Sequence, residues 1–141
     1  MIIDRLNIWR RFEDLKVWQK AKSLCSEIFE MTSKGKFSND FALIDQINKS
    51  SGSVMDNIAE GFGRMGNKEF INFLTYANAS LLECNSQVYR AFDRNYIIQE
   101  AGERLFRLIE EIGKMINTLI VYLRKSDFRG QKSKERPTTK E

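Results

Sequence analysis

Residues 68–94 read KEFINFLTYANASLLECNSQVYRAFDR, and this stretch decides the fold. Its apolar residues recur at spacings that alternate between four and three, which is a heptad pattern over three repeats. A helix with this pattern buries one narrow seam against its neighbours, and Asn67 offers a capping oxygen at its start. The predicted seam consists of Phe70, Leu74, Ala77, Leu81, Cys84, Val88 and Ala91.

Three further segments carry helical periodicity on either side of this stretch. Residues 99–125 repeat the alternation of four and three, and residues 39–62 have a narrow seam. Ser50-Ser51-Gly52-Ser53, in the middle of that seam, would let a neighbouring helix approach closely. Residues 12–32 have an apolar arc of roughly 160°. The glycine that follows, Gly35, suits a left-handed helix end. The seam of 99–125 consists of Leu105, Ile109, Ile112, Ile116, Leu119 and Leu123.

Four amphipathic helices with short connections predict an all-α fold, namely an antiparallel up-down-up-down four-helix bundle. No alternating run bounded by hairpin turn residues predicts a strand. We expect an N-terminal extension at 1–11, the four-helix bundle domain at 12–125, and a basic, disordered tail at 126–141.

The net charge of the 141 residues is +4, and its location matters. Residues 124–141 contain seven basic and three acidic residues, so residues 1–123 are neutral overall. A second, smaller basic cluster lies near the N-terminus, close to Trp9, where aromatic and cationic side chains could contact a nucleic acid or a partner. The candidate contact residues are Arg10, Arg11, Lys16, Lys20, Arg124, Lys125 and Arg129.

The third and fourth segments carry more apolar surface than one seam needs. The fourth has a combined apolar arc of about 200°, against about 100° for a helix that faces one core. The surplus is either part of a thick intramolecular core or a subunit interface, and we favour the interface. Its candidate residues are Ile71, Leu82, Tyr89, Leu108, Met115 and Tyr122.

The residues that most enzymes use are missing from this chain. It contains no histidine, which excludes Ser-His-Asp and Cys-His nucleophiles. The two cysteines, Cys25 and Cys84, fall at apolar positions, and we interpret them as buried thiols rather than metal ligands. We therefore expect no catalytic residues, no metal, no cofactor and no small-molecule substrate. No apolar run reaches the roughly 18 residues of a membrane span, and we expect a cytoplasmic protein without a membrane partner.

Three stretches carry a resemblance to a known family. They are FEDLKVWQKA at 12–21, DNIAEGFGR at 56–64 and NKEFINFL at 67–74. Together they resemble the four helix bundle protein family, also called the 23S rRNA intervening-sequence protein family, over about residues 12–125. Within these motifs we assign structural roles to Trp18, Asn57, Glu60 and Gly61.

The resemblance implies an antiparallel four-helix bundle that forms a ring-shaped homo-oligomer, typically a pentamer. Some family members are encoded within insertions in large-subunit ribosomal RNA genes. Distant relatives are accessory proteins of diversity-generating retroelements and bind a reverse transcriptase and nucleic acid. This chain departs from the family pattern at 46–55, where the usual arginine is missing, and at 78–80, where Asn-Ala-Ser replaces Gly-Ser. The missing arginine weakens the inference of RNA binding.

Two functions remain open from the sequence. The first is a non-catalytic, homo-oligomeric binding module that contacts RNA, DNA or a nucleic-acid-associated protein. The alternative is a structural or protein-interaction scaffold with no nucleic-acid role, which the neutral helical body favours.

Overall fold

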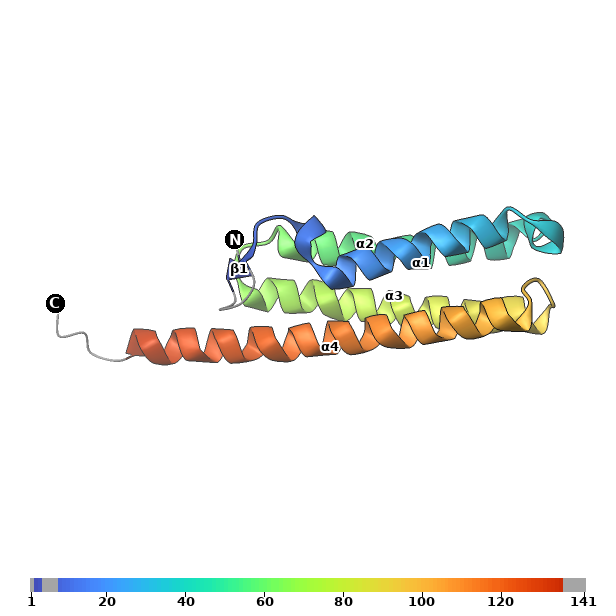
Figure 1. The fold of residues 1–141 in the computed structure, drawn as a ribbon. Coiled ribbons are helices and arrows are strands. Elements are labelled where there is room, and N and C mark those ends of the chain that lie inside the picture. Colours follow the sequence, from blue (N-terminus) through green and yellow to red (C-terminus); the bar gives the residue numbers. More distant parts are fainter. Residues whose placement is uncertain (1, 4–7, 136–141) are drawn as a thin grey trace.

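Four helices lie side by side along one long axis in the computed structural model, which describes residues 2–3 and 8–135 (Figure 1). Two short 3-10 helices precede the first and second of them. The all-α class and the four predicted helices are thus confirmed. The elements are η1 (Phe12–Asp14), α1 (Lys16–Thr32), η2 (Gly35–Asn39), α2 (Phe41–Phe62), α3 (Asn67–Asp93) and α4 (Gln99–Glu135).

A pair of two-residue strands precedes the helices. Strand β1 (Ile2–Ile3) pairs antiparallel with β2 (Ile8–Trp9), so that Ile2 lies opposite Trp9. The prediction that the chain has no strand is wrong at this point. Ile and Trp favour strands, but a ladder of two residues is too short to produce the alternation that reveals a strand in sequence.

The core is built from the seams that the sequence predicted. All seven seam residues of α3 and all six of α4 are buried. The contact between α2 and α3 is the most extensive in the molecule, and that between α1 and α4 is the smallest among neighbouring helices. Small buried residues of α2 lie in its contact with α3: Ser50 lies against Gln87, and Gly61 lies against Phe70 and Phe73.

One end of the bundle is closed by contacts between its two connections. The Asp40 carboxylate caps α2 by accepting from the Leu43 N–H at 3.2 Å. Its other oxygen accepts from the Arg94 guanidinium at 2.8 Å and from the Tyr96 hydroxyl at 2.9 Å. The Tyr96 ring stacks on Phe37 at 5.0 Å. The α1–α2 and α3–α4 connections therefore meet at the same end.

Two helix starts differ from the prediction. Helix α1 begins at Lys16 because Leu15 is extended, with ψ 121°, and η1 covers the residues before it. Asn67 is the first residue of α3 rather than its cap, and its side-chain amide donates to the Leu123 carbonyl at 3.1 Å. Gly66, with φ +97°, makes the turn that precedes α3. Gly35 takes the predicted left-handed conformation, with φ +55°.

Helix α4 runs past the predicted boundary of the bundle domain. It continues through residues 126–135, which the sequence assigned to the tail beyond the bundle domain. Adding a residue to an existing helix gains one hydrogen bond per residue fixed, and proline does not occur before Pro137. Residues 136–141 lie outside the described part of the chain.

Candidate interaction surfaces

The α3 stripe that the sequence assigned to a subunit interface is largely exposed. Leu82 is 62% exposed and Tyr89 is 53% exposed. The Tyr89 ring lies 4.4 Å from the ring of Phe106 on α4, measured between centroids. Ile71 differs, because it is partly buried and packs against the core. Leu82 and Tyr89 thus offer apolar surface that the described part of the chain leaves largely exposed.

The three α4 residues assigned to the same interface lie on a different side. Leu108, Met115 and Tyr122 are partly buried and pack against the core. Met115 and Tyr122 line a groove between the N-terminal segment, the start of α1 and α4. The ring of Trp9 meets that of Tyr122 edge to face, 6.0 Å between centroids. Part of the apolar surplus of α4 is therefore used within the chain, which was the first of the two alternatives.

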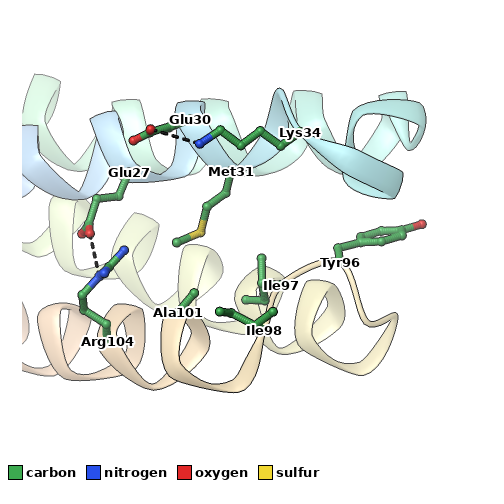
Figure 2. A pocket seen from close by; sticks show the side chains of 9 residues that line it. All are labelled: Glu27, Glu30, Met31, Lys34, Tyr96, Ile97, Ile98, Ala101 and Arg104. Atoms are coloured by element: carbon green, nitrogen blue, oxygen red, sulfur yellow. Dashed lines mark hydrogen bonds and ion pairs between the residues drawn. The ribbon is translucent and has the colours of Figure 1, made fainter.

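Ion pairs link α1 to α4 along the seam between these helices. The Lys20 ammonium lies 3.4 Å from the Glu111 carboxylate, and the Arg104 guanidinium lies 2.9 Å from that of Glu27. Figure 2 shows the second pair beside a hollow of about 330 Å³, into which Met31 points from α1. Exposed pairs of this kind contribute about 0–1 kcal/mol each, so they add little to the apolar packing that α1 and α4 share in the core.

The N-terminal basic residues are positioned by a carboxylate. The backbone N–H groups of Arg10 and Arg11 donate to one Asp14 oxygen at 3.0 and 3.1 Å, and these bonds hold the pKa of Asp14 below its usual range. The Arg11 guanidinium lies 3.9 Å from the Glu13 carboxylate, with both side chains exposed. Neither arginine is buried, so both cations face solvent.

Most of the basic candidates gather at one end of the bundle. Because Trp9 contacts Tyr122, the N-terminal arginines lie at the end of the molecule where α4 carries Arg124 and Lys125, both exposed. Lys16 lines the groove beside Tyr122 and belongs to the same end. Lys20 does not, because it pairs with α4 near the middle of the bundle. Arg129 is on α4, but its side chain lies outside the described residues.

Trp18 occupies a position between core and surface. It is partly buried and packs against the core, and the ring of Phe12 meets it edge to face at 5.0 Å. The Lys22 ammonium lies 5.9 Å from its ring centroid. These contacts join η1 to α1 and are consistent with a structural role.

The second family motif lies at the end of α2. The Asn57 amide donates to the Ser53 carbonyl at 2.8 Å, one turn earlier, and Glu60 pairs with Arg64 at 3.0 Å. Gly61 is buried, and a Cβ added there would lie only 2.6 Å from a side-chain carbon of α3. The glycine therefore permits the close approach of α3, whereas Asn57 and Glu60 stabilise the helix end locally.

A buried polar contact between α2 and α3 was not predicted from the sequence. The Ser50 hydroxyl donates to the Gln87 side-chain carbonyl, and both side chains are buried. Nearby, the hydroxyls of Ser53 and Ser80 hydrogen bond at 2.9 Å. The row of serines in α2 was the available signal, but the partner on α3 depends on how the two helices are aligned.

The two cysteines differ in burial and in the groups around their thiols. Cys84 is fully buried, and burial raises the pKa of its thiol to about 12, whereas Cys25 is partly buried and accepts from the Ser51 hydroxyl at 3.9 Å. Among the side chains that the structure describes, no group of three or more Cys, Asp or Glu could hold a metal ion. None of the helices in this part of the chain has the length and apolarity that a bilayer crossing requires.

The fold defines an all-α protein in which four helices pack around one apolar core. The family model of the 23S rRNA-intervening sequence protein matches residues 13–118. The chain belongs to this family, which confirms the resemblance read from the three motifs. No curated protein matches it.

One similar solved structure supports the fold. It is the crystal structure of a protein with unknown function from the S23 ribosomal protein family of Bacteroides thetaiotaomicron. It has a TM-score of 0.67 at 23% identity and covers 74% of this chain and 97% of its own. This similarity concerns the fold alone.

Proposed function

We propose that this protein is a non-catalytic, cytoplasmic homo-oligomer of up-down-up-down four-helix bundles that binds nucleic acid or a nucleic-acid-associated protein. The observation that carries the binding proposal is the gathering of basic residues from distant parts of the chain at one bundle end. Arg10, Arg11 and Lys16 come from the N-terminal part, and Arg124 and Lys125 come from α4. In an oligomer these cations are multiplied, which favours binding to a phosphate backbone.

Self-association is supported by the exposed apolar pair on α3. Leu82 and Tyr89 lie two turns apart on one face, and large exposed apolar patches usually mark contacts. Since α1 and the N-terminal segment partly cover Met115 and Tyr122, we place the assembly surface on α3 rather than on α4. The family resemblance favours a ring of five copies.

Multi-angle light scattering tests the assembly. The wild-type protein should have a mass that is a multiple of its 16.5 kDa chain, five of them for a pentamer. Leu82→Glu should lower this mass, because it places a charge in the interface. Met65→Glu is the matched control, since Met65 is 94% exposed in the turn before α3 and should leave the mass unchanged. A monomeric wild type at micromolar concentration would refute the assembly.

An electrophoretic shift assay with structured RNA and duplex DNA tests the binding. The double variant Arg124→Gln/Lys125→Gln should weaken binding, and salt should weaken it steeply in the wild type. Lys34→Gln/Lys36→Gln, at the opposite end of the bundle, is the charge-matched control. If no shift occurs at micromolar protein and low salt, the protein does not bind these nucleic acids.

The second candidate function is a protein-interaction scaffold with no nucleic-acid role. Its support is the exposed apolar surface of Leu82 and Tyr89, which suits a protein partner as well as a second copy. Capture of one specific protein in nuclease-treated extract, lost in Leu82→Glu, would favour the scaffold.

A further inference from the structure

We propose that the groove between the N-terminal segment and α4 binds a small organic anion with an apolar body, such as a medium-chain carboxylate. This inference goes beyond the proposed function and does not rest on it. The groove lies on the α1 side of α4, away from the α3 face assigned to assembly. Its three walls come from segments far apart in sequence: β2, the start of α1 and the second half of α4.

The size and lining of the groove suit an apolar body. Its volume is about 480 Å³, within the roughly 300–1,000 Å³ typical of small-molecule sites. Three of its apolar residues are buried and form the floor, and three are partly exposed and form the sides. The floor is Leu15, Val17 and Leu119, and the sides are Trp9, Met115 and Tyr122.

The charged residues at the rim of the groove favour an anionic ligand. Lys16 is exposed and forms no ion pair within the described part of the chain. Lys114 pairs with Glu110 at 3.3 Å on the open surface, and such a pair is weak enough to exchange for a ligand. Asp14 is the one carboxylate in the lining, and two backbone N–H groups already bind one of its oxygens.

The start of α1 adds to this positive rim. Leu15, Lys16 and Val17 all line the groove, so the first turn of α1 opens beside it. No side chain caps this turn, and unpaired N–H groups at a helix start carry partial positive charge. An apolar floor beneath two lysines and one carboxylate, a lining with a net positive charge, therefore matches an amphipathic anion better than a cationic molecule.

Calorimetric titration of the full-length protein with decanoate, kept below its micelle concentration, tests the proposal. Decanoate should bind saturably with one site per chain, and decanol, which has the same tail without the charge, should bind more weakly. A change in the emission of Trp9 in a Trp18→Phe background reports binding at the groove itself. Absence of saturable decanoate binding, or equal affinity for decanol, would overturn the proposal.

Three variants separate the groove from other sites. Lys16→Gln should weaken decanoate binding roughly two- to fivefold, as expected for an exposed charge pair, and leave decanol unaffected. Lys22→Gln, on the other flank of α1 over Trp18, is the matched control and should change neither. Thr118→Trp, at the exposed rim, should block both ligands. If Lys16→Gln and Lys22→Gln have equal effects, the site is elsewhere.

The assembly and the groove can fail separately. Leu82→Glu protein should bind decanoate as wild type does, even when its mass in solution falls. If the protein is monomeric and still binds decanoate, only the proposal of assembly is refuted, and the proposal for the groove is retained.

Discussion

Two glycines in one helix should respond to alanine in opposite directions. Gly52 and Gly61 both lie in α2. A Cβ at Gly61 would lie 2.6 Å from the Cβ of Phe73 and 3.0 Å from a ring carbon of Phe70, whereas one at Gly52 would meet nothing within 4 Å. Carbon atoms prefer about 3.5–4.0 Å, so α3 would have to move by about 1 Å.

The size of each effect follows from this geometry. The clash at Gly61 involves the Cβ of Phe73, which is fixed to the backbone and cannot rotate away. Overpacking of this kind lowers the free energy of unfolding by about 1–3 kcal/mol. The higher helix propensity of alanine offsets at most about 1 kcal/mol of this loss. Gly61→Ala should therefore lower the free energy of unfolding by about 1–2 kcal/mol. Gly52→Ala should raise it by up to about 1 kcal/mol.

Thermal unfolding followed by circular dichroism, at one fixed protein concentration, measures both effects. For a chain of this size about 1 kcal/mol corresponds to roughly 3–4 °C. The melting temperature should fall by roughly 3–8 °C in Gly61→Ala and rise by up to about 4 °C in Gly52→Ala. If both variants are stabilised, the close approach of α2 and α3 at Gly61 is not as described, and the reasoning fails.

Three further predictions concern buried and charged groups. Ser50→Ala leaves the buried Gln87 carbonyl without its donor and should lower the free energy of unfolding by about 1–3 kcal/mol in urea. The pKa of Asp40 is lowered chiefly by the backbone N–H it caps on α2, then by its hydroxyl and guanidinium partners. The contribution of the Asp40 carboxylate to the free energy of unfolding is present above its unfolded pKa and is lost as pH falls through its folded pKa. The free energy of unfolding of Asp40→Asn should therefore depend less steeply on pH in the acid range. Since burial raises the pKa of the Cys84 thiol to about 12, iodoacetamide at pH 8 should modify Cys25 first, and mass spectrometry of proteolytic fragments distinguishes the two.

Helix existence could be predicted because periodicity is a local property. The spacing from Phe70 to Ala91 specifies one buried face whatever the neighbours are, and that face is buried in the structure. Helix ends were less predictable. The extended Leu15 and the continuation of α4 past Lys125 depend on packing and propagation rather than on a local stop signal.

The candidate surfaces could be predicted only in part. The sequence assigned the surplus apolar residues of the third and fourth helices to a single interface. In the structure Leu82 and Tyr89 are exposed, whereas Met115 and Tyr122 lie against the N-terminal segment. Period and hydropathy are the same for a residue covered by its own chain and for one left open. For Met115 and Tyr122 the answer depends on where Trp9 packs, and Trp9 lies more than one hundred residues away from them in sequence.

The sequence by itself determined the helical class, the buried seams, the absence of histidine and the family, because each depends on residue identity or on short spacings. Only the tertiary structure decided which residues from distant segments meet. It brings Trp9, Lys16 and Tyr122 to one groove, Asp40 to Arg94 at the far end, and the N-terminal arginines to the basic end of α4. These contacts arise from the alignment of whole helices, which no local pattern encodes.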